Sequence, residues 1–343
     1  MNADLVRLAH TGSNPDMLRR MVAESGWSGA IRRLRSSPKT SPAVRAALDV
    51  DVETRLERLA AIDVELVAED DHRYPASLID LPDRPLWLFV RGDLPEAFGV
   101  AVVGSRRATR YGLDVARAIG SRAAAAGWPV ISGLAAGVDT AAHSGAVDST
   151  GVTSAVLGSG IDVWYPRRNR SLGEAILAGG GAVVSEFPPG TTPEPWRFPA
   201  RNRIISGFAG VVIVVEAAVR SGALITARLA LEQGRSVMAV PGDLARETSA
   251  GTNLLIRDGA HPLTDLDALV EELELVMGPA PGESVPEAAG AFDALLTLIG
   301  PTSVPLDDLA ARAGLPIDRL LARLTHLELS GAVTVENGSV RSA

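Results

Sequence analysis

The strongest constraint on the fold is the stretch Phe198–Leu231, in which an apolar strand feeds a small-residue loop and a helix. Arg201, Asn202 and Arg203 precede the strand, which occupies residues 211–215 and ends at Glu216, and the loop follows at 221–223. A strand, a loop of small residues and a helix N-terminus in this order gather backbone N–H groups around an anion. The stretch therefore predicts either an anion site completed by the two arginines or a plain βα unit with two surface arginines.

The same order of apolar strand, small-residue loop and helix repeats through the middle of the chain. Short apolar segments alternate with helical ones, and a glycine or another small residue follows most of the apolar segments. We expect strands at 100–103, 129–132, 153–157, 182–185, 211–215 and 236–240, and helices at 113–126, 139–146, 171–178 and 224–231. This alternation predicts an α/β fold, an extended Rossmann-like doubly wound parallel sheet with its ligand loops at the carboxyl ends of the strands.

One flanking module is predicted on each side of this domain. Residues 1–60 have helical spacing at 5–9, 15–25 and 43–61 and predict a small helical module of the helix-hairpin or SAM kind. The sheet domain is assigned to 61–277, with added edge strands at 64–68 and 86–90, and a Pro/Gly/Glu linker to 278–290. Residues 291–343 predict a winged helix: helical runs at 292–299, 306–313 and 317–329 precede a hairpin with an Asn337-Gly338 turn.

Composition narrows the classes of function. The net charge is −8, yet residues 100–260 carry 16 basic and 12 acidic side chains, a balance of +4, whereas residues 261–343 carry 4 and 13, a balance of −9. The absence of cysteine excludes disulfides and thiolate chemistry, and five scattered histidines predict no metal site. No signal peptide or long apolar span is recognisable, so a cytoplasmic protein without a membrane partner is expected.

Four loops of small residues converge on the predicted sheet edge. They are Gly104-Ser105-Arg106, Ser132-Gly133, Gly158-Ser159-Gly160 and Ser221-Gly222. Small residues let a phosphate approach the backbone amides, and arginines supply charge, so four such loops favour an anion site over a purely structural explanation. The full dinucleotide fingerprint is missing, which argues against a nicotinamide cofactor, and no other cofactor is indicated.

Catalytic groups are scarce. Asp139 and His143 are four residues apart on an expected helix, and the pair could act in acid–base chemistry or, as we favour, brace the loop before it. Glu186 and Glu216 follow strands, where a carboxylate often accepts from loop amides or pairs with an arginine. No nucleophile elbow, Walker loop or metal-ligand cluster is recognisable, so no catalytic residue is assigned.

An ordered series of motifs resembles the DNA-processing protein A family, also called Smf, densely over residues 60–265. The motifs are GSRRATRYG (104–112), SGLAAGVDTAAH (132–143), GSGIDVWYPRRN (158–169), SEFPPG (185–190), FPARNRIISG (198–207), VVEAAVRSGALITA (214–227) and AVPGD (239–243). The resemblance implies an extended Rossmann fold that binds single-stranded DNA, forms a homodimer and helps load the recombinase RecA onto incoming DNA in natural transformation. The family is not known as an enzyme.

The resemblance also implies the DNA contacts. Gly104, Ser105 and Arg106 match its GSR motif, and Ser132 and Gly133 match its amide-donating turn. Arg167 stands where the family often has lysine, and Arg197 precedes the motif that contains Arg201, Asn202 and Arg203. Arg106, Arg167, Arg197 and Arg203 are expected to be the main cationic contacts.

Two other functions are weighed against DNA binding at the sheet. Lysine-decarboxylase-like nucleoside-monophosphate phosphoribohydrolases share this kind of sheet, but they are expected to carry PGGxGTxxE, and Ser221–Arg228 lacks its second glycine and its acid. A DNA regulator acting through the winged helix would need a basic recognition helix. Residues 287–343 carry four basic against seven acidic side chains, so we expect that module to bind a partner or to regulate.

Overall fold

The computed structural model describes residues 2–281 and, after them, 298–299, 303–313, 317, 320–321, 324, 327, 333–336 and 339–342. The chain divides into two compact units, Met1–Pro281 and Gly282–Ala343. No helix in the described part of the chain is long and apolar enough to cross a membrane.

The first unit is built on one nine-stranded sheet, in the order β1-β2-β6-β5-β4-β3-β7-β8-β9. Strand β2 pairs antiparallel with β1 and β6, and the other pairs are parallel. The strands are β1 (Glu65–Ala68), β2 (Trp87–Gly92), β3 (Gly99–Val103), β4 (Val130–Ser132), β5 (Thr153–Leu157), β6 (Ala182–Ser185), β7 (Ala209–Val214), β8 (Ser236–Ala239) and β9 (His261–Pro262). Strands β1 and β2 are the two added strands that the sequence predicts, but only β1 lies at the edge, because β2 pairs with both β1 and β6.

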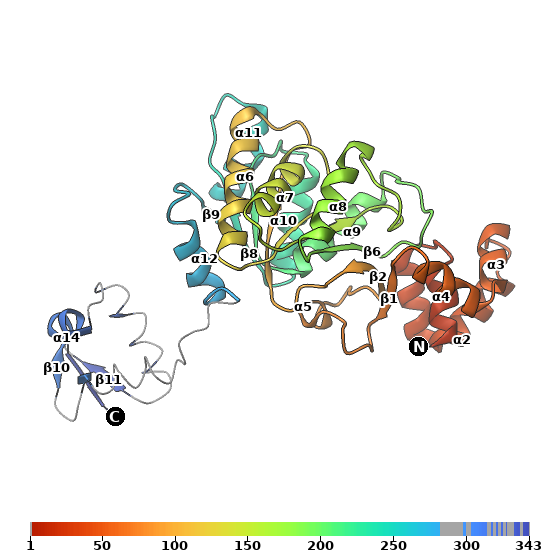
Figure 1. Ribbon diagram of the computed structural model, residues 1–343, viewed down its shortest axis with the longest axis horizontal. Coiled ribbons are helices and arrows are strands. Elements are labelled where there is room, and N and C mark those ends of the chain that lie inside the picture. Colours follow the sequence, from red (N-terminus) through yellow and green to blue (C-terminus); the bar gives the residue numbers. More distant parts are fainter. Residues whose placement is uncertain are drawn as a thin grey trace. The chain divides into compact units, whose positions relative to one another are not determined.

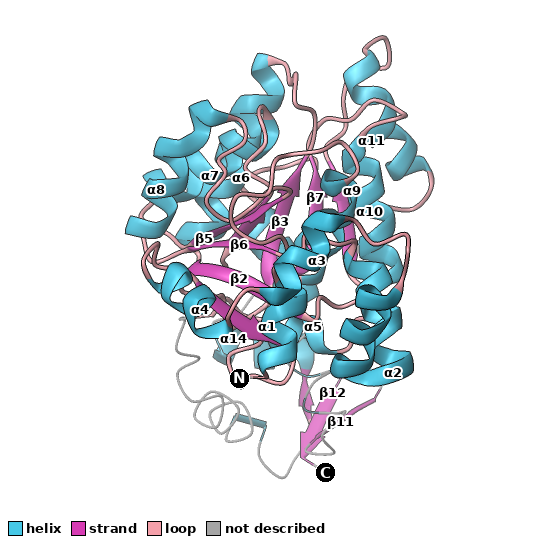
Figure 2. Ribbon diagram, turned by 90° about the vertical axis from the view of Figure 1, so that its right-hand side faces the viewer, coloured by secondary structure: helices cyan, strands magenta, loops and turns pink. Residues whose placement is uncertain are grey.

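The sheet is doubly wound about β3. From β3 the chain moves outward through β4, β5 and β6, and then returns to the other side of β3 to add β7, β8 and β9. The crossing helices α6 (Arg110–Ala125), α7 (Val138–Asp148) and α8 (Arg170–Ala178) therefore lie on one face, and α9 (Arg197–Gly207) and α10 (Gly222–Glu232) on the other (Figure 2). The predicted fold class is confirmed, and the order reverses between β3 and β7, where such folds place their ligands.

The core follows from the alternation of side chains along the strands. Val100 and Val102 of β3 face α6 and α7, while Ala101 and Val103 face α9 and α10. Both sets are apolar because the sheet is covered on both faces. Helix α12 (Leu269–Met277), which the sequence analysis did not predict, adds Leu269 and Leu273 to the first face.

Four helices precede the sheet: α1 (Ala3–Ala9), α2 (Pro15–Ser36), α3 (Pro42–Asp49) and α4 (Val52–Ala60). They share a core with Trp87 and Phe89 of β2 and lie beside β1 and β2 (Figure 1). The single helix expected at 43–61 is wrong, because Asp51 begins a new helix by accepting a hydrogen bond from the Thr54 amide at 3.1 Å. Two further helices, α5 (Ala76–Ile79) and α11 (Glu247–Arg257), were also not predicted.

The second unit contains a three-stranded antiparallel sheet, β10-β12-β11. Its elements are β10 (Val304–Pro305), α14 (Leu306–Ala313), β11 (Val333–Glu336) and β12 (Ser339–Ser342). Leu309 packs there with Leu320 and Leu324. The predicted helix at 306–313 and the two hairpin strands are confirmed. The linker residues 282–290, most of the runs at 292–299 and 317–329 and the Asn337-Gly338 turn lie outside the described residues.

Candidate nucleic-acid interface

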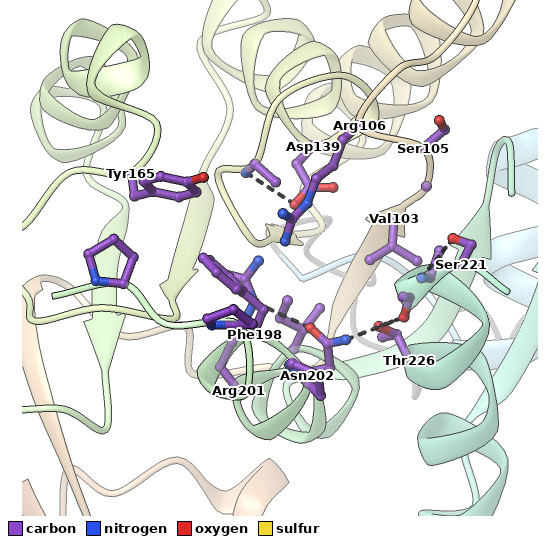
Figure 3. A pocket seen from close by; sticks show the side chains of 18 of the residues that line it. Val103, Ser105, Arg106, Asp139, Tyr165, Phe198, Arg201, Asn202, Ser221 and Thr226 are labelled. Atoms are coloured by element: carbon purple, nitrogen blue, oxygen red, sulfur yellow. Dashed lines mark hydrogen bonds between the residues drawn. The ribbon is translucent and has the colours of Figure 1, made fainter. Parts of the chain in front are cut away.

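A pocket of about 520 Å³ opens at the carboxyl ends of β3 and β7, where the strand order reverses (Figure 3). A second pocket of about 200 Å³ shares its wall. Residues that line both are Arg106, Ala135, Tyr165, Phe198 and Arg201. The strand ends and loops that the sequence singled out therefore do meet at one edge of the sheet.

Glu216 holds the loop that follows β3. Its buried carboxylate accepts hydrogen bonds from the amide and the hydroxyl of Thr109, at 2.8 and 2.6 Å, and its carbonyl accepts from the Ser105 amide at 2.7 Å. Gly104 must be glycine because a Cβ atom there would lie 2.9 Å from the Glu216 carbonyl oxygen and 2.6 Å from Val138. The expectation that a carboxylate at this strand end binds loop amides is confirmed, and the loop presents Arg106 in one position.

Arg106 and two aromatic rings form the exposed wall of the pocket. The Arg106 guanidinium carbon lies 4.6 Å from the centroid of the Phe198 ring, and the Phe198 and Tyr165 rings lie 5.5 Å apart. In Figure 3 Arg106 points across the pocket toward Phe198. Tyr165 is 45% exposed. Nucleic-acid bases stack on rings and on arginine of this kind, and the charge pairs with phosphate.

Arg201 forms the floor of the pocket. It is 4% exposed and donates to the carbonyl of Val156 and, at 2.8 Å, to that of Gly133. Burial lowers the pKa of Arg201 to about 10, so it stays a cation at neutral pH. Gly133 carries no side chain because a Cβ atom would lie 2.2 Å from Nη2 of Arg201. Arg201 is therefore both a fixed charge under the pocket and a brace between β4 and β5.

Asp139 is the buried carboxylate beside Arg201. It accepts hydrogen bonds from the amides of Gly133 at 3.1 Å and Ala135 at 3.2 Å. Burial raises the pKa of Asp139, an effect that Arg201 and the two amides oppose. The Gly133 amide, which the resemblance implies as a donor to DNA, thus already has a partner within the protein, and the Ser132 hydroxyl donates to the Val102 carbonyl at 2.7 Å.

The predicted pairing of Asp139 with His143 is wrong. His143 is fully buried, and its Nδ1–H donates to Thr153 Oγ1 at 2.7 Å, because that hydroxyl itself donates to the Val130 carbonyl. Burial and the positive charge of Arg201 lower the pKa of His143 to about 3, so the ring is neutral at neutral pH. His143 supports β4 and β5 from below and does not line the pocket.

Asn202 joins α9 to the first turn of α10. Its Nδ2 donates to the Gly222 carbonyl at 3.3 Å, and the Ser221 hydroxyl caps α10 by accepting from the Ala223 amide at 3.1 Å. Ser221, Gly222 and Ala223 line the pocket, so a helix N-terminus faces it (Figure 3). A helix N-terminus and nearby arginines together favour an anion.

Three of the predicted cationic contacts lie elsewhere. Arg203 is buried and donates to both oxygens of Glu186, at 2.7 and 2.9 Å, the arginine–carboxylate pairing foreseen for that glutamate. Arg197 is also buried, donates to the Thr192 carbonyl and lies 4.9 Å from the Trp196 ring centroid. Arg167 is exposed in a short 3₁₀ turn (Arg167–Asn169) and does not line the pocket.

A basic groove of about 550 Å³ leads away from the pocket between α6 and α7. It begins at Arg106 and is lined by Arg107, Arg110, Arg117 and Arg168. Two of these arginines have acidic partners, Arg110 with Asp114 at 2.9 Å and Arg117 with Asp148. Arg168 also lines the second pocket, so the groove and the pockets share one basic surface.

Sequence reasoning missed four residues of this interface: Phe198, Tyr165, Arg107 and Arg168. Each stands inside a motif that was singled out: Phe198, Arg107 and Arg168 directly beside a chosen residue, and Tyr165 two residues before Arg167. The signal that could have found them is an aromatic residue next to an arginine at a strand's carboxyl end, the composition of a stacking surface.

Comparisons with known proteins find two family models that match this chain. The family model described as DNA recombination-mediator protein A matches residues 65–274, and the DprA winged helix domain matches residues 279–339. Protein Smf of Escherichia coli K12 is 38% identical over 98% of this chain and 91% of its own length. DNA processing protein DprA of Streptococcus pneumoniae R6 is 42% identical over 60% of this chain and 72% of its own length.

Two solved structures share the fold. The X-ray structure of DNA processing protein A from Streptococcus pneumoniae aligns with a TM-score of 0.65 and 32% identity, over 79% of this chain and 98% of that one. DNA processing protein A from Helicobacter pylori aligns with a TM-score of 0.55 and 27% identity, over 61% of this chain and 95% of that one. The description of the second structure concerns a single-stranded DNA binding mode.

Proposed function

This chain belongs to the DNA recombination-mediator protein A family, and from that membership we propose that it binds single-stranded DNA at the carboxyl edge of its sheet. The observation that carries the proposal is the surface formed by Arg106, Phe198 and Tyr165 beside the N-terminus of α10. The rings take bases, and Arg106, with Arg201 beneath it, attracts the phosphates. The Helicobacter pylori relative, named for its single-stranded DNA binding mode, supports this choice.

The basic groove between α6 and α7 gives the strand a path out of the pocket. Arg107 and Arg168 are exposed along this groove. Arg106 and Arg168 also line the second pocket, so the groove and that pocket share two arginines. Phosphate contacts along such a groove are independent of sequence, so binding is sequence-tolerant and weakens with salt. Arg203 is left out of the contact set because Glu186 neutralises it inside the protein.

The remaining roles are carried over from the family resemblance. We propose that the protein is a non-enzymatic homodimer of the cytoplasm that protects incoming DNA and helps load RecA in natural transformation. The Asp139 carboxylate, which lines the pocket, is held by two backbone amides and a buried arginine, a setting that suits a structural role.

One titration tests the binding function and its rival together. The purified protein is titrated with an oligothymidylate, a duplex of equal length and AMP, and the AMP sample is assayed for released adenine. We expect the single strand to bind tightly, the duplex to bind more weakly, and no adenine to form. Adenine release, with no preference for the single strand, would replace this proposal by a nucleotide phosphoribohydrolase.

A further inference from the structure

Arg55 of α4 is a buried cation whose donors are incompletely used. The residue is 4% exposed, and one amino group donates to the Ala47 carbonyl. Its Nε and Nη1 atoms have no hydrogen-bond partner among the described residues. Burial, then repulsion from Arg58 and Arg7, lowers the pKa of Arg55 to about 10, so the group remains charged at neutral pH. A buried charge with free donors is unfavourable until an anion or water reaches it.

Arg55 lines a pocket of about 290 Å³, separate from the DNA pocket and made mostly by the N-terminal helices. Arg58 and His10 line it too, together with the apolar side chains of Val50, Leu59 and Pro189. His10 is fixed there, since its Nδ1–H donates to the Val6 carbonyl at 2.8 Å and its ring lies edge-on to Phe89. No acidic residue is among the described residues that line this pocket.

We propose that this pocket binds a phosphomonoester group. Two arginines line the pocket and no described acidic residue does, so a dianion balances their charge better than a single carboxylate. A phosphomonoester supplies a dianion with three acceptor oxygens. Leu59, Val50 and Pro189 form an apolar wall for the uncharged body attached to that group. A free phosphate ester and the 5′-phosphorylated end of a DNA strand present the same chemistry.

The path of the chain favours the 5′-phosphorylated end of a DNA strand as the source of this group. Pro189 belongs to the segment between β6 and α9, and Pro193 and Pro195 of the same segment line the DNA pocket. A single loop therefore borders both pockets. The phosphate pocket does not depend on the proposed DNA function, because a free ester would satisfy the same donors.

Thermal unfolding of the full chain in phosphate, against chloride at equal ionic strength, tests the site. We expect phosphate to raise the Tm of the parent by about 2–5 °C, beyond its general salting effect. The rise should fall to the background level in Arg55→Met. It should persist in Arg45→Met, which removes an exposed arginine of the same module, and in Arg106→Ala, which alters the DNA pocket. An equal rise in Arg55→Met, or an equal loss in Arg45→Met, would refute the proposal.

A second variant covers the case in which Arg55→Met does not fold. Arg58 is exposed, so Arg58→Gln should fold. This variant should raise the dissociation constant for phosphate roughly two- to fivefold. An unchanged constant in Arg58→Gln would count against the site.

Oligonucleotides with and without a 5′-phosphate identify the source of the group. Tighter binding of the phosphorylated strand that is lost in Arg58→Gln assigns the site to a strand end, and equal binding of both strands assigns it to a free ester. If Arg106→Ala loses all DNA binding while phosphate still raises its Tm, the loss concerns the DNA pocket and leaves the phosphate pocket supported.

Discussion

Arg106 is the exposed cation of the DNA pocket, and its replacement should change both affinity and salt dependence. A single-strand phosphate contact contributes about 0.7 to the slope of log K against log salt. Arg106→Ala should therefore bind an oligothymidylate more weakly and with a slope smaller by about 0.7, measured by fluorescence anisotropy between low and moderate salt. Parent-like binding over the whole salt range would show that the pocket is not the contact.

Arg122→Ala is the matched control. Arg122 lies on α6, twelve residues after the first residue of that helix, Arg110, which places it about 18 Å of helix rise from the loop that carries Arg106. It is partly exposed and pairs with Asp267 at 2.7 Å. Its loss removes the same charge from the same sheet domain, and the salt slope should stay as in the parent.

Phe198 contributes stacking rather than charge. Loss of one base–ring stack costs about 1–3 kcal/mol, roughly 5- to 150-fold in affinity. Phe198→Ala should weaken binding by that factor with an unchanged salt slope, and Phe198→Tyr should bind like the parent. A changed slope in Phe198→Ala, or no loss of affinity, would mean that the ring only supports Arg106.

His143 links acidity to stability. Its pKa is about 3 in the folded chain, against about 6.5 when unfolded, so the folded state binds fewer protons between these values. The free energy of unfolding should therefore fall as the pH drops below about 6.5, by up to ~1.4 kcal/mol per pH unit from this residue. Urea unfolding of His143→Asn between pH 4.5 and 7 should show a flatter pH dependence.

At the scale of elements, α9 explains why one motif serves two purposes. The sequence marks Arg201, Asn202 and Arg203 as one block, and the structure places all three in a single helix. Residues two apart on a helix point about 200° away from each other. Arg201 therefore lies under the pocket, while Arg203 points to Glu186 and Asp83 on the opposite side. Helical periodicity, applied to the motif, could have separated the two roles.

The Arg203–Glu186 pair should act on stability and not on DNA affinity. Although burial opposes its charge, Glu186 and Asp83 raise the pKa of Arg203. Arg203→Met leaves the Glu186 carboxylate buried and unpaired, which should lower the free energy of unfolding by about 3–5 kcal/mol. Adding Glu186→Leu should recover part of that loss. Urea unfolding measures both variants.

A DNA-binding measurement distinguishes this structural role of Arg203 from the DNA contact that the sequence analysis expects of it. Under conditions where Arg203→Met remains folded, its affinity for an oligothymidylate should match that of the parent. A smaller salt slope in the folded variant would restore Arg203 to the DNA contacts.

The strands were predictable, whereas several helices were not. Strands such as β7 are nearly continuous apolar runs because both faces of the sheet are covered, and that pattern is visible in the sequence. The break between α3 and α4 depends on one capping contact of Asp51 in a region of continuous helical spacing. The pocket's loops were predicted from their glycines, but the internal partners of Gly133 and Arg203 are tertiary contacts that no local pattern records.

At the scale of the whole molecule, the boundary of the first unit falls a few residues later than predicted. The sequence ends the sheet domain at 277, but Ala280 is buried in the core beside α6 and α12. A Cβ atom on Gly127 would lie 2.5 Å from the Pro281 carbonyl, so the chain still packs closely on the first unit there. A truncated protein meant to keep this core should therefore end after Pro281 and not after Gly278.

Removal of the C-terminal unit should leave single-strand affinity nearly unchanged. Residues 282–343 carry four basic and eight acidic side chains, a balance that repels a polyanion and offers few partners for phosphate. The first unit contains both pockets and the basic groove in full. A protein truncated after Pro281 should thus bind an oligothymidylate within about twofold of the full chain, under ~0.5 kcal/mol. Light scattering checks that the oligomeric state is the same. If the folded truncated protein loses tenfold or more at an unchanged oligomeric state, the winged helix is part of the DNA site.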